Sequence, residues 1–200
     1  MCGRFSFVME DALIRERFGL RVTTAIYKAR YNCAPTQSLA VITSDLPDEL
    51  HFMRWGLIPS WAKDISIGAK MINARAETVS EKPSFHSALK SRRCLVPATG
   101  FFEWKREGKS KIPFLIRMKE QNGFCFAGLW DRWNSPEGGL IESFTIITTT
   151  PNELVSGIHN RMPVILPQES EKQWLGTESS MHDLTSLLQP FPSELMEARV

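Results

Sequence analysis

The sequence predicts an α+β fold: a single domain with a curved, barrel-like and mainly antiparallel β-sheet core and short flanking helices. Short apolar segments typical of strands outnumber the helical patterns, and glycine-containing turns separate several of them. The chain has 200 residues, 42% hydrophobic and 23% charged, which is enough for one domain with a buried core. We therefore expect a single domain over residues 1–200.

The predicted strands are short and either alternating or continuously apolar. In chain order they are Leu39–Thr43, His51–Leu57, Arg93–Pro97, Phe114–Met118, Phe124–Leu129, Phe144–Thr149 and Met162–Leu166. The turn signals between them are Glu107-Gly108, Asn122-Gly123 and Glu137-Gly138-Gly139. Short strands joined by such turns favour an antiparallel arrangement.

Helical patterns are fewer and shorter. They cover Met9–Phe18, Ser84–Lys90, Asn152–Ser156 and Pro167–Trp174. Two of these segments begin directly after a proline, at Ser84 and at Asn152, and serine and asparagine are favoured where a helix starts. We expect these helices to flank the sheet and not to form the core.

Composition excludes several classes of protein. The net charge is only +2, so nucleic-acid binding cannot be argued from total charge. The four cysteines lie far apart with no CxxC pair, so neither a zinc site nor a disulfide framework is indicated. We expect a cytoplasmic protein, because the separate cysteines fit a reducing compartment, the start of the chain lacks a signal region and no apolar run is long enough to cross a membrane. The sequence indicates no metal or organic cofactor.

Cys2 carries the most specific chemical signal. Loss of Met1 would place a free α-amine and a thiol on adjacent carbons, and this 1,2-aminothiol can condense with an aldehyde and close a five-membered thiazolidine ring. The same residue could instead act as an N-terminal nucleophile with its own amine as the base. Ordinary pKa values of about 7.7–8.0 for the amine and about 8.5 for the thiol leave part of each deprotonated near neutrality.

Two further segments carry residues that could contact a ligand. Gly3 beside Cys2 permits close approach of the backbone to a ligand, and the guanidinium of Arg4 suits a phosphate. Asn73, Arg75 and Glu77 alternate along the chain, so an extended strand would point all three to the same side. By itself this pattern also fits a solvated strand face.

Two later segments add candidate groups. Glu103 lies among aromatic residues, and apolar surroundings suit a carboxyl group that exchanges protons near neutral pH. His159 lies two residues before Arg161, ahead of an apolar strand. Trp61, in a polar loop, and Trp104, next to Glu103, are the tryptophans that could stack on an unpaired base.

Taken together, these segments resemble the SRAP family, the SOS-response-associated peptidases. The resemblance rests on six ordered blocks, Met1–Phe5, Tyr31–Thr36, Arg54–Trp61, Asn73–Glu77, Gly100–Trp104 and Ile158–Pro163. Many relatives continue past the position of Val200, which raises the question whether the C-terminal end of the domain is shortened here.

The resemblance implies a role in the DNA damage response. It implies that Cys2, freed by loss of Met1, forms a covalent thiazolidine with the ring-opened aldehyde of an abasic site in single-stranded DNA and so shields the lesion. Asn73 would hydrogen-bond the cross-link region, Glu103 would move protons at the amine and the sugar, and His159 would assist the Schiff-base chemistry.

The remaining expected contacts are with the DNA strand. Arg4, Arg75 and Arg161 would bind phosphates, and Trp61 and Trp104 would flank the kinked strand. The expected partner is single-stranded DNA containing an abasic site, bound by a monomer, with abasic-site lyase activity as a side reaction. Peptidase activity would be limited to autocatalytic removal of Met1.

Two other functions remain open at this point. The Met-Cys-Gly start also opens glutamine amidotransferases, in which the N-terminal cysteine forms a thioester with glutamine, although no later segment here resembles theirs. Alternatively, the protein could be a non-covalent module that binds single-stranded or modified DNA through its arginines and tryptophans, with Cys2 in a structural role.

Overall fold

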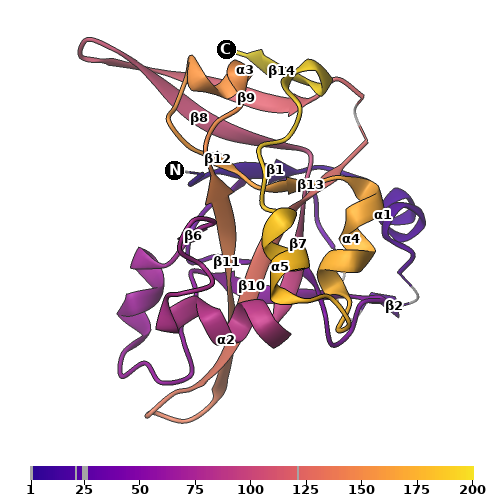
Figure 1. Ribbon diagram of the computed structural model, residues 1–200, viewed down its shortest axis with the longest axis vertical. Coiled ribbons are helices and arrows are strands. Elements are labelled where there is room, and N and C mark those ends of the chain that lie inside the picture. The colour runs from indigo at the N-terminus through magenta and orange to yellow at the C-terminus, as the bar shows by residue number, and fades with distance from the viewer. Residues whose placement is uncertain (1, 21, 24–26, 121) are drawn as a thin grey trace.

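The computed structural model describes the chain except for residues 1, 21, 24–26 and 121, and of residues 22 and 23 it describes the backbone only. Strands form two sheets, of nine and five strands, and short helices lie around them (Figure 1). The predicted α+β fold with a mainly antiparallel core is confirmed.

The larger sheet contains a closed barrel. Its strands are β4 (Ser38–Thr43), β5 (Glu49–Trp55), β7 (Arg93–Ala98), β10 (Phe124–Asn134) and β11 (Leu140–Thr149). They pair in the order β11-β10-β7-β4-β5 through antiparallel ladders. The ring closes because β5 also pairs with β11, in parallel. Closure leaves these strands without a free edge, and their inward side chains form the core.

Short strands extend this sheet. β2 (Val22–Thr23) pairs with β5, β6 (Asn73–Arg75) and β12 (Met162–Pro163) pair with β11, and β13 (Ile165–Leu166) pairs with β10. The predicted strand at Met162–Leu166 is therefore divided between two neighbours. The pairing of β6 with β11 is parallel and aligns Asn73 with Ile146.

The smaller sheet has the order β14-β9-β8-β1-β3. Its strands are β1 (Phe5–Phe7), β3 (Arg30–Cys33), β8 (Gly100–Glu107), β9 (Ser110–Met118) and β14 (Met196–Arg199). The β8–β9 hairpin projects beyond the rest of the molecule, at the top in Figure 1. Phe5 joins this sheet to the barrel, since its ring centroid lies 5.3 Å from that of Trp55 and 5.7 Å from that of Phe126.

The four predicted helices are all present. They are α1 (Asp11–Phe18), α2 (Pro83–Ser91), α3 (Glu153–Ser156) and α4 (Gln168–Leu175). Asn152 caps α3 as its position suggested, because its side-chain oxygen accepts a hydrogen bond from the Val155 amide at 2.9 Å. No helix in the described part of the chain is long and apolar enough to cross a membrane.

Sequence patterns missed several short elements. These are β1, β2, β3, β6, β8 and β14, the helix α5 (Met181–Ser186), and the 3₁₀ turns η1 (Ile65–Lys70) and η2 (Ser193–Leu195). β1 and β6 span three residues each, which is too short for an alternating pattern to be recognised. β5 ends at Trp55, before the predicted Leu57, because Gly56 has a φ of 124° and continues as a bend.

One buried arginine fastens two helices to the barrel. Arg93, in β7, is only 1% exposed. Its guanidinium donates to the carbonyls of Leu89 and Lys90 at the end of α2, at 2.8 and 2.7 Å. It also donates to the carbonyls of Trp174 and Gly176 at the end of α4, each at 2.5 Å. These carbonyls would otherwise lack partners at the two helix ends.

Replacing Arg93 by methionine should therefore cost about 3–5 kcal/mol of unfolding free energy, since it leaves buried carbonyls without donors. Urea denaturation at pH 7 measures this, with Arg106→Met on the exposed end of β8 as the control. A loss below about 1 kcal/mol for Arg93→Met would show that water replaces the guanidinium at little cost.

Candidate functional site

The position of Cys2 follows from the pairing of β1 with β8. The ladder aligns Phe5 with Phe101, and the amide of Phe102 donates to the carbonyl of Arg4 at 2.9 Å. Continuing this antiparallel register toward the start of the chain brings Gly3 opposite Glu103. The neighbouring Cys2 therefore lies close to this carboxyl group, whose charge acts on its thiol. Two segments a hundred residues apart in the sequence are thus placed side by side by a few backbone hydrogen bonds.

The thiol of Cys2 is enclosed. Cys2 has 0% relative exposure, and its Sγ lies 4.0 Å from the carbonyl oxygen of Arg4. Burial raises the pKa of the Cys2 thiol well above its usual value, and the nearby negative charge of Glu103 raises it further. In this environment the sulfur is held as a neutral thiol, and its reaction requires a group that accepts the proton.

Glu103 and His159 provide such groups. Glu103 is 3% exposed, and its Oε2 lies 4.0 Å from Nε2 of His159. The other imidazole nitrogen, Nδ1, lies 3.0 Å from the backbone nitrogen of Arg161 and 3.2 Å from its carbonyl oxygen. When Nδ1 accepts the Arg161 N–H, the neutral ring carries its proton on Nε2, which faces Glu103. The structure thus brings Cys2, Glu103 and His159 together as a thiol beside a carboxyl–imidazole pair.

Asn73 and Arg75 lie on β6, which pairs with β11. The side-chain nitrogen of Asn73 donates to the carbonyl of Ile146 on β11 at 3.4 Å. Its Oδ1 is buried and has no hydrogen-bond partner among the described residues. A buried amide oxygen without a partner is costly, so this atom is available to accept a hydrogen bond from a ligand. Arg75 follows on the same face of β6 and is exposed.

Arg161 is held by the protein itself. Its guanidinium forms a two-pronged ion pair with Glu77, at 2.5 and 3.0 Å, and donates to the carbonyl of Thr148 at 2.7 Å. The hydrogen bonds from Arg161 lower the pKa of the Glu77 carboxyl. Because Thr148 is aligned with Arg75 across the β6–β11 pairing, the guanidinium of Arg161 lies next to the strand position that faces Arg75. The binding of phosphate by either residue stays a prediction.

Sequence reasoning missed the roles of Glu77 and Thr148 as partners of Arg161. Glu77 was noted as a carboxylate in the same segment as Asn73, but nothing in the spacing linked it to Arg161, which lies 84 positions away. Thr148 carried no signal, since a threonine in a strand usually serves the sheet.

The other predicted DNA contacts are distributed more widely. Arg4 bonds to the carbonyl of Gly3 at 2.8 Å and is half-buried. Trp104 is 36% exposed and lies on the face of β8 opposite to the buried Glu103. Trp61 is 58% exposed in a turn fastened to β10 by a bond from the Ser60 amide to the Asp131 carboxylate. No contact among the described residues joins Trp61 to Cys2.

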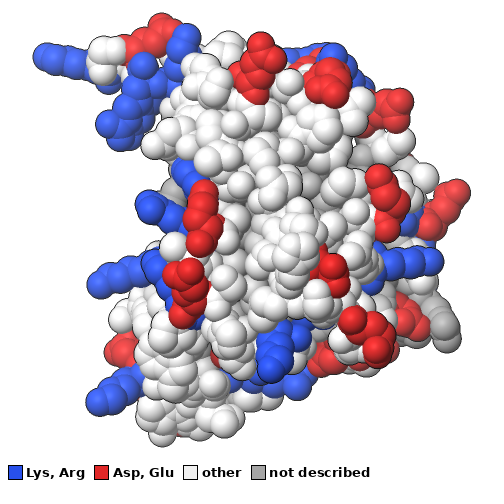
Figure 2. All heavy atoms as spheres, in the orientation of Figure 1, with Lys and Arg blue, Asp and Glu red and all other residues white. Residues whose placement is uncertain are grey.

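Basic side chains follow one edge of the molecule. Figure 2 shows Lys and Arg along the edge where the N-terminus, β6 and the β8–β9 hairpin lie in Figure 1, and this edge is hollowed below the hairpin. Acidic side chains lie between them. The total charge of +2 therefore conceals an uneven surface distribution.

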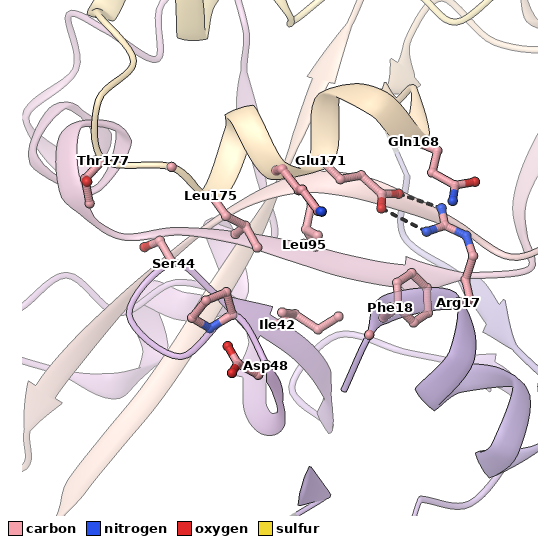
Figure 3. Close-up of a pocket in the computed structure, with 14 residues that line it drawn as sticks. Arg17, Phe18, Ile42, Ser44, Asp48, Leu95, Gln168, Glu171, Leu175 and Thr177 are labelled. Carbon is pink, nitrogen blue, oxygen red and sulfur yellow. Dashed lines mark hydrogen bonds and ion pairs between the residues drawn. The ribbon is translucent and has the colours of Figure 1, made fainter. Parts of the chain in front are cut away.

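A separate cavity lies elsewhere on the molecule. It has a volume of about 800 Å³ and is bordered by α1, α4 and the start of the β4–β5 loop (Figure 3). Arg17 and Glu171 form an ion pair on its wall, with nitrogen–oxygen distances of 2.9 and 2.7 Å. None of the predicted site residues lines it. Within the described part of the chain no cluster of three or more His, Cys, Asp or Glu residues could hold a metal ion.

Fold and site together define the class: an α+β protein with a closed barrel, whose N-terminal cysteine lies beside a carboxyl and an imidazole group. The family model described as SOS response associated peptidase (SRAP) matches residues 1–200. The chain belongs to this family.

Individual proteins are also similar to this chain in sequence and in structure. The chain is 52% identical over 203 aligned positions to the abasic site processing protein YoqW of Bacillus subtilis, covering 99% of this chain and 91% of that protein. It is 32% identical to the abasic site processing protein HMCES of Xenopus tropicalis, over 82% of this chain and 59% of that protein. A crystal structure of a protein from Bacteroides thetaiotaomicron superposes with a TM-score of 0.92 at 37% identity, covering 98% of this chain and 90% of that one.

The Arg161–Glu77 pair leads to a prediction about acid stability. Because the folded-state pKa of Glu77 is lowered, the pair stabilises the fold above the ordinary pKa of 4.5, and this contribution is lost as the pH falls through the lower folded value. Glu77→Gln should lower the unfolding free energy by at most about 1 kcal/mol at pH 7, since the carboxyl is 46% exposed to solvent. The difference from wild type should shrink toward zero at low pH.

Urea denaturation at pH 7 and at pH 3 measures both quantities. Glu137→Gln, in the exposed turn between β10 and β11, is the matched control. A deficit in Glu77→Gln that is equally large at both pH values would mean that shape or packing, and not ionisation, carries the effect.

Proposed function

We propose that this protein binds DNA at abasic sites and, once Met1 is removed, joins Cys2 covalently to the ring-opened aldehyde of the lesion. The observation that carries the proposal is the placement of the Cys2 thiol beside Glu103 and His159. Relatives named abasic site processing proteins identify the substrate class. The product would shield the lesion from cleavage as part of the DNA damage response.

The chemistry balances with the groups present. The α-amine of Cys2 adds to the aldehyde carbon, and loss of one water gives a protonated imine. The thiol then adds through sulfur to the same carbon, its proton is released, and a neutral thiazolidine results. Glu103 accepts the thiol proton and returns protons to the departing hydroxyl, while His159 donates from Nε2 toward the sugar oxygen that is released on ring opening.

Burial of Cys2 gives this chemistry its selectivity. An enclosed thiol with a raised pKa reacts slowly with solutes, because the thiolate is the reactive form. Once the imine has formed, thiol and carbon belong to one molecule, so the high effective concentration overcomes the weak nucleophilicity. Intact nucleotides offer no aldehyde, so the lesion itself supplies specificity and base sequence matters little.

The remaining predicted residues would bind the DNA strand around the lesion. Arg4 and the exposed Arg75 would neutralise phosphates on either side of the lesion, and the buried Oδ1 of Asn73 would accept a hydrogen bond from the cross-link region. Arg161, already paired with Glu77, would contribute either by positioning His159 or by exchanging its partner for a phosphate. Trp61 and Trp104 would flank a single strand, bound by a monomer.

Two side activities follow from the same intermediates. An imine at the lesion can lose the 3′ phosphate by elimination before the thiol closes the ring, which would appear as lyase activity. Removal of Met1 by the protein itself would be the one peptidase reaction, because the amine of Cys2 is blocked until that bond is cut.

The covalent mechanism predicts a DNA–protein complex that resists denaturation. The Met1-processed protein, incubated with a single-stranded oligonucleotide carrying one abasic site, should give a shifted band on a denaturing gel, and Cys2→Ala should give none. An oligonucleotide without the lesion is the control. Protection of the lesion by Cys2→Ala equal to that by wild type would support non-covalent binding, and glutamine turnover without DNA binding would support an amidotransferase.

Proton transfer by Glu103 predicts a separation of rate from affinity. Glu103→Gln should slow cross-link formation by about 10²-fold, since it removes a general acid–base group, while affinity for intact single strands stays within about twofold. Quenched time courses and fluorescence anisotropy measure the two quantities. Glu107→Gln, at the exposed end of the same strand, should behave as wild type in both; loss of affinity and rate in equal measure in Glu103→Gln would assign Glu103 to folding.

A further inference from the structure

The outer face of the β8–β9 hairpin carries side chains that the chemistry at Cys2 does not use. Phe101 and Glu103 are buried on the inner face of β8, so Phe102, Trp104 and Arg106 lie on the outer face by strand alternation. The register places Leu115 opposite Phe102, Pro113 opposite Trp104 and Lys111 opposite Arg106. Aromatic and basic residues therefore follow each other along one exposed strand face.

The basic end of this face is electrostatically strained. Arg106 and Lys111 are directly opposite each other, and like charges at such positions destabilise a strand pair. Glu107, the acidic residue nearest the turn of the hairpin, forms an ion pair with Lys105, with an Oε1–Nζ distance of 2.9 Å. Neither Arg106 nor Lys111 has an ion-pair partner in the described part of the chain, and both are exposed. An anion bound between them would relieve the repulsion.

The other end of the face opens into a cavity of about 350 Å³. Its walls include the ring of Tyr31, which is 73% exposed, and that of Phe102. The hydroxyls of Ser6 and Thr99 also line it, but they bond to each other and to neighbouring backbone groups. The side-chain amide of Asn122 provides a donor and an acceptor. Aromatic walls with a few polar groups, at this volume, fit a planar heterocycle of the size of a nucleobase.

The charges at the cavity favour a base over a phosphate. Arg117 on the wall is already neutralised by Glu197, with an Nε–Oε1 distance of 2.7 Å. Glu120 adds a carboxylate, which would repel a phosphate but can accept hydrogen bonds from the amino group of a base. The phosphate-binding and base-binding features thus lie at opposite ends of the same face.

A strand can reach this face from the site at Cys2. The ladder of β8 with β1 aligns Gly100 and Phe101 only, whereas its ladder with β9 continues to Glu107. Among the described residues the pairing of β8 with β1 therefore ends at Phe101, and a flexible chain can pass around the edge of β8 beyond it, from the inner to the outer face. From Phe102 to Arg106 the strand rises about 14 Å, enough for a few nucleotides.

We propose that the outer face of β8 and β9 binds the single-stranded DNA that flanks the lesion. A base inserts between Tyr31 and Phe102, and phosphates lie between Arg106 and Lys111. The inference rests on the proposed function, because the partner is taken to be the strand that carries the abasic site. It adds a second contact region, on the sheet face opposite to Glu103, which would hold DNA before and after the covalent step.

The phosphate end is tested with undamaged single-stranded DNA. Arg106→Ala/Lys111→Ala should weaken binding, and the plot of log affinity against log salt should become less steep by about 1.4, since each phosphate contact on a single strand contributes about 0.7. Lys82→Ala/Lys90→Ala, just before the start and in the last turn of α2, removes the same charge and should leave the slope unchanged, because α2 lies far from the hairpin (Figure 1). Equal slopes for the two double variants would overturn the phosphate contact.

The base end is tested at Tyr31, whose side chain is 73% exposed and so contributes little to the stability of the fold. Tyr31→Ala should weaken binding about fivefold or more, because it removes a stacking surface, and Tyr31→Phe should restore it. Binding by Tyr31→Ala equal to wild type would remove the base contact.

Cross-linking separates this inference from the proposed function. At saturating protein, all of these variants should give the denaturant-resistant band on a lesion oligonucleotide, since Cys2 and Glu103 are untouched. Absence of that band for the wild type would reject the covalent function even if the outer face binds DNA. Wild-type affinity and salt slope in every variant, with the band intact, would reject the outer face alone.

Discussion

The pairing of β1 with β8 is the constraint on which the site depends. A few backbone hydrogen bonds, with Phe5 inserted among the aromatic side chains of the barrel, hold the start of the chain against a strand from its middle. N-terminal segments usually fray because little holds them in place. Here Phe5, three residues from Cys2, is packed into the core and anchors the segment. The thiol next to Glu103 is therefore held firmly in place.

Closure of the barrel fixes the strand on which the next part of the network depends. The parallel contact of β5 with β11 completes the ring, and β6, which carries Asn73 and Arg75, also pairs with β11. Arg161 bridges Thr148 of β11 and Glu77 beyond β6, and its backbone fixes the ring of His159. The imidazole is therefore oriented by the same network that fastens β6, so its geometry does not depend on the mobility of a loop.

Sequence patterns identified the individual site residues, but they did not show which of these residues interact with each other or with other parts of the chain. Cys2, Glu103 and His159 each stood out by chemistry or by surroundings, and the structure brings the three together. The pairing of Arg161 with Glu77 could not be inferred, because the partners are far apart in the chain and each looks like an ordinary surface charge. Likewise the separation of Glu103 from Trp104 onto two faces follows only once residues 100–107 are known to be a strand.

The sequence by itself determined the α+β class, most of the longer strands and helices, β8 and α5 excepted, and the residues able to carry the chemistry. These depend on local periodicity, turn residues and side-chain type. Tertiary structure decided the closure of the barrel, the strands of two to four residues, and the burial of Cys2 against Glu103. Such strands are stable only through their partners, and burial depends on what packs above a residue. Both are properties of contacts between distant segments, which no local pattern contains.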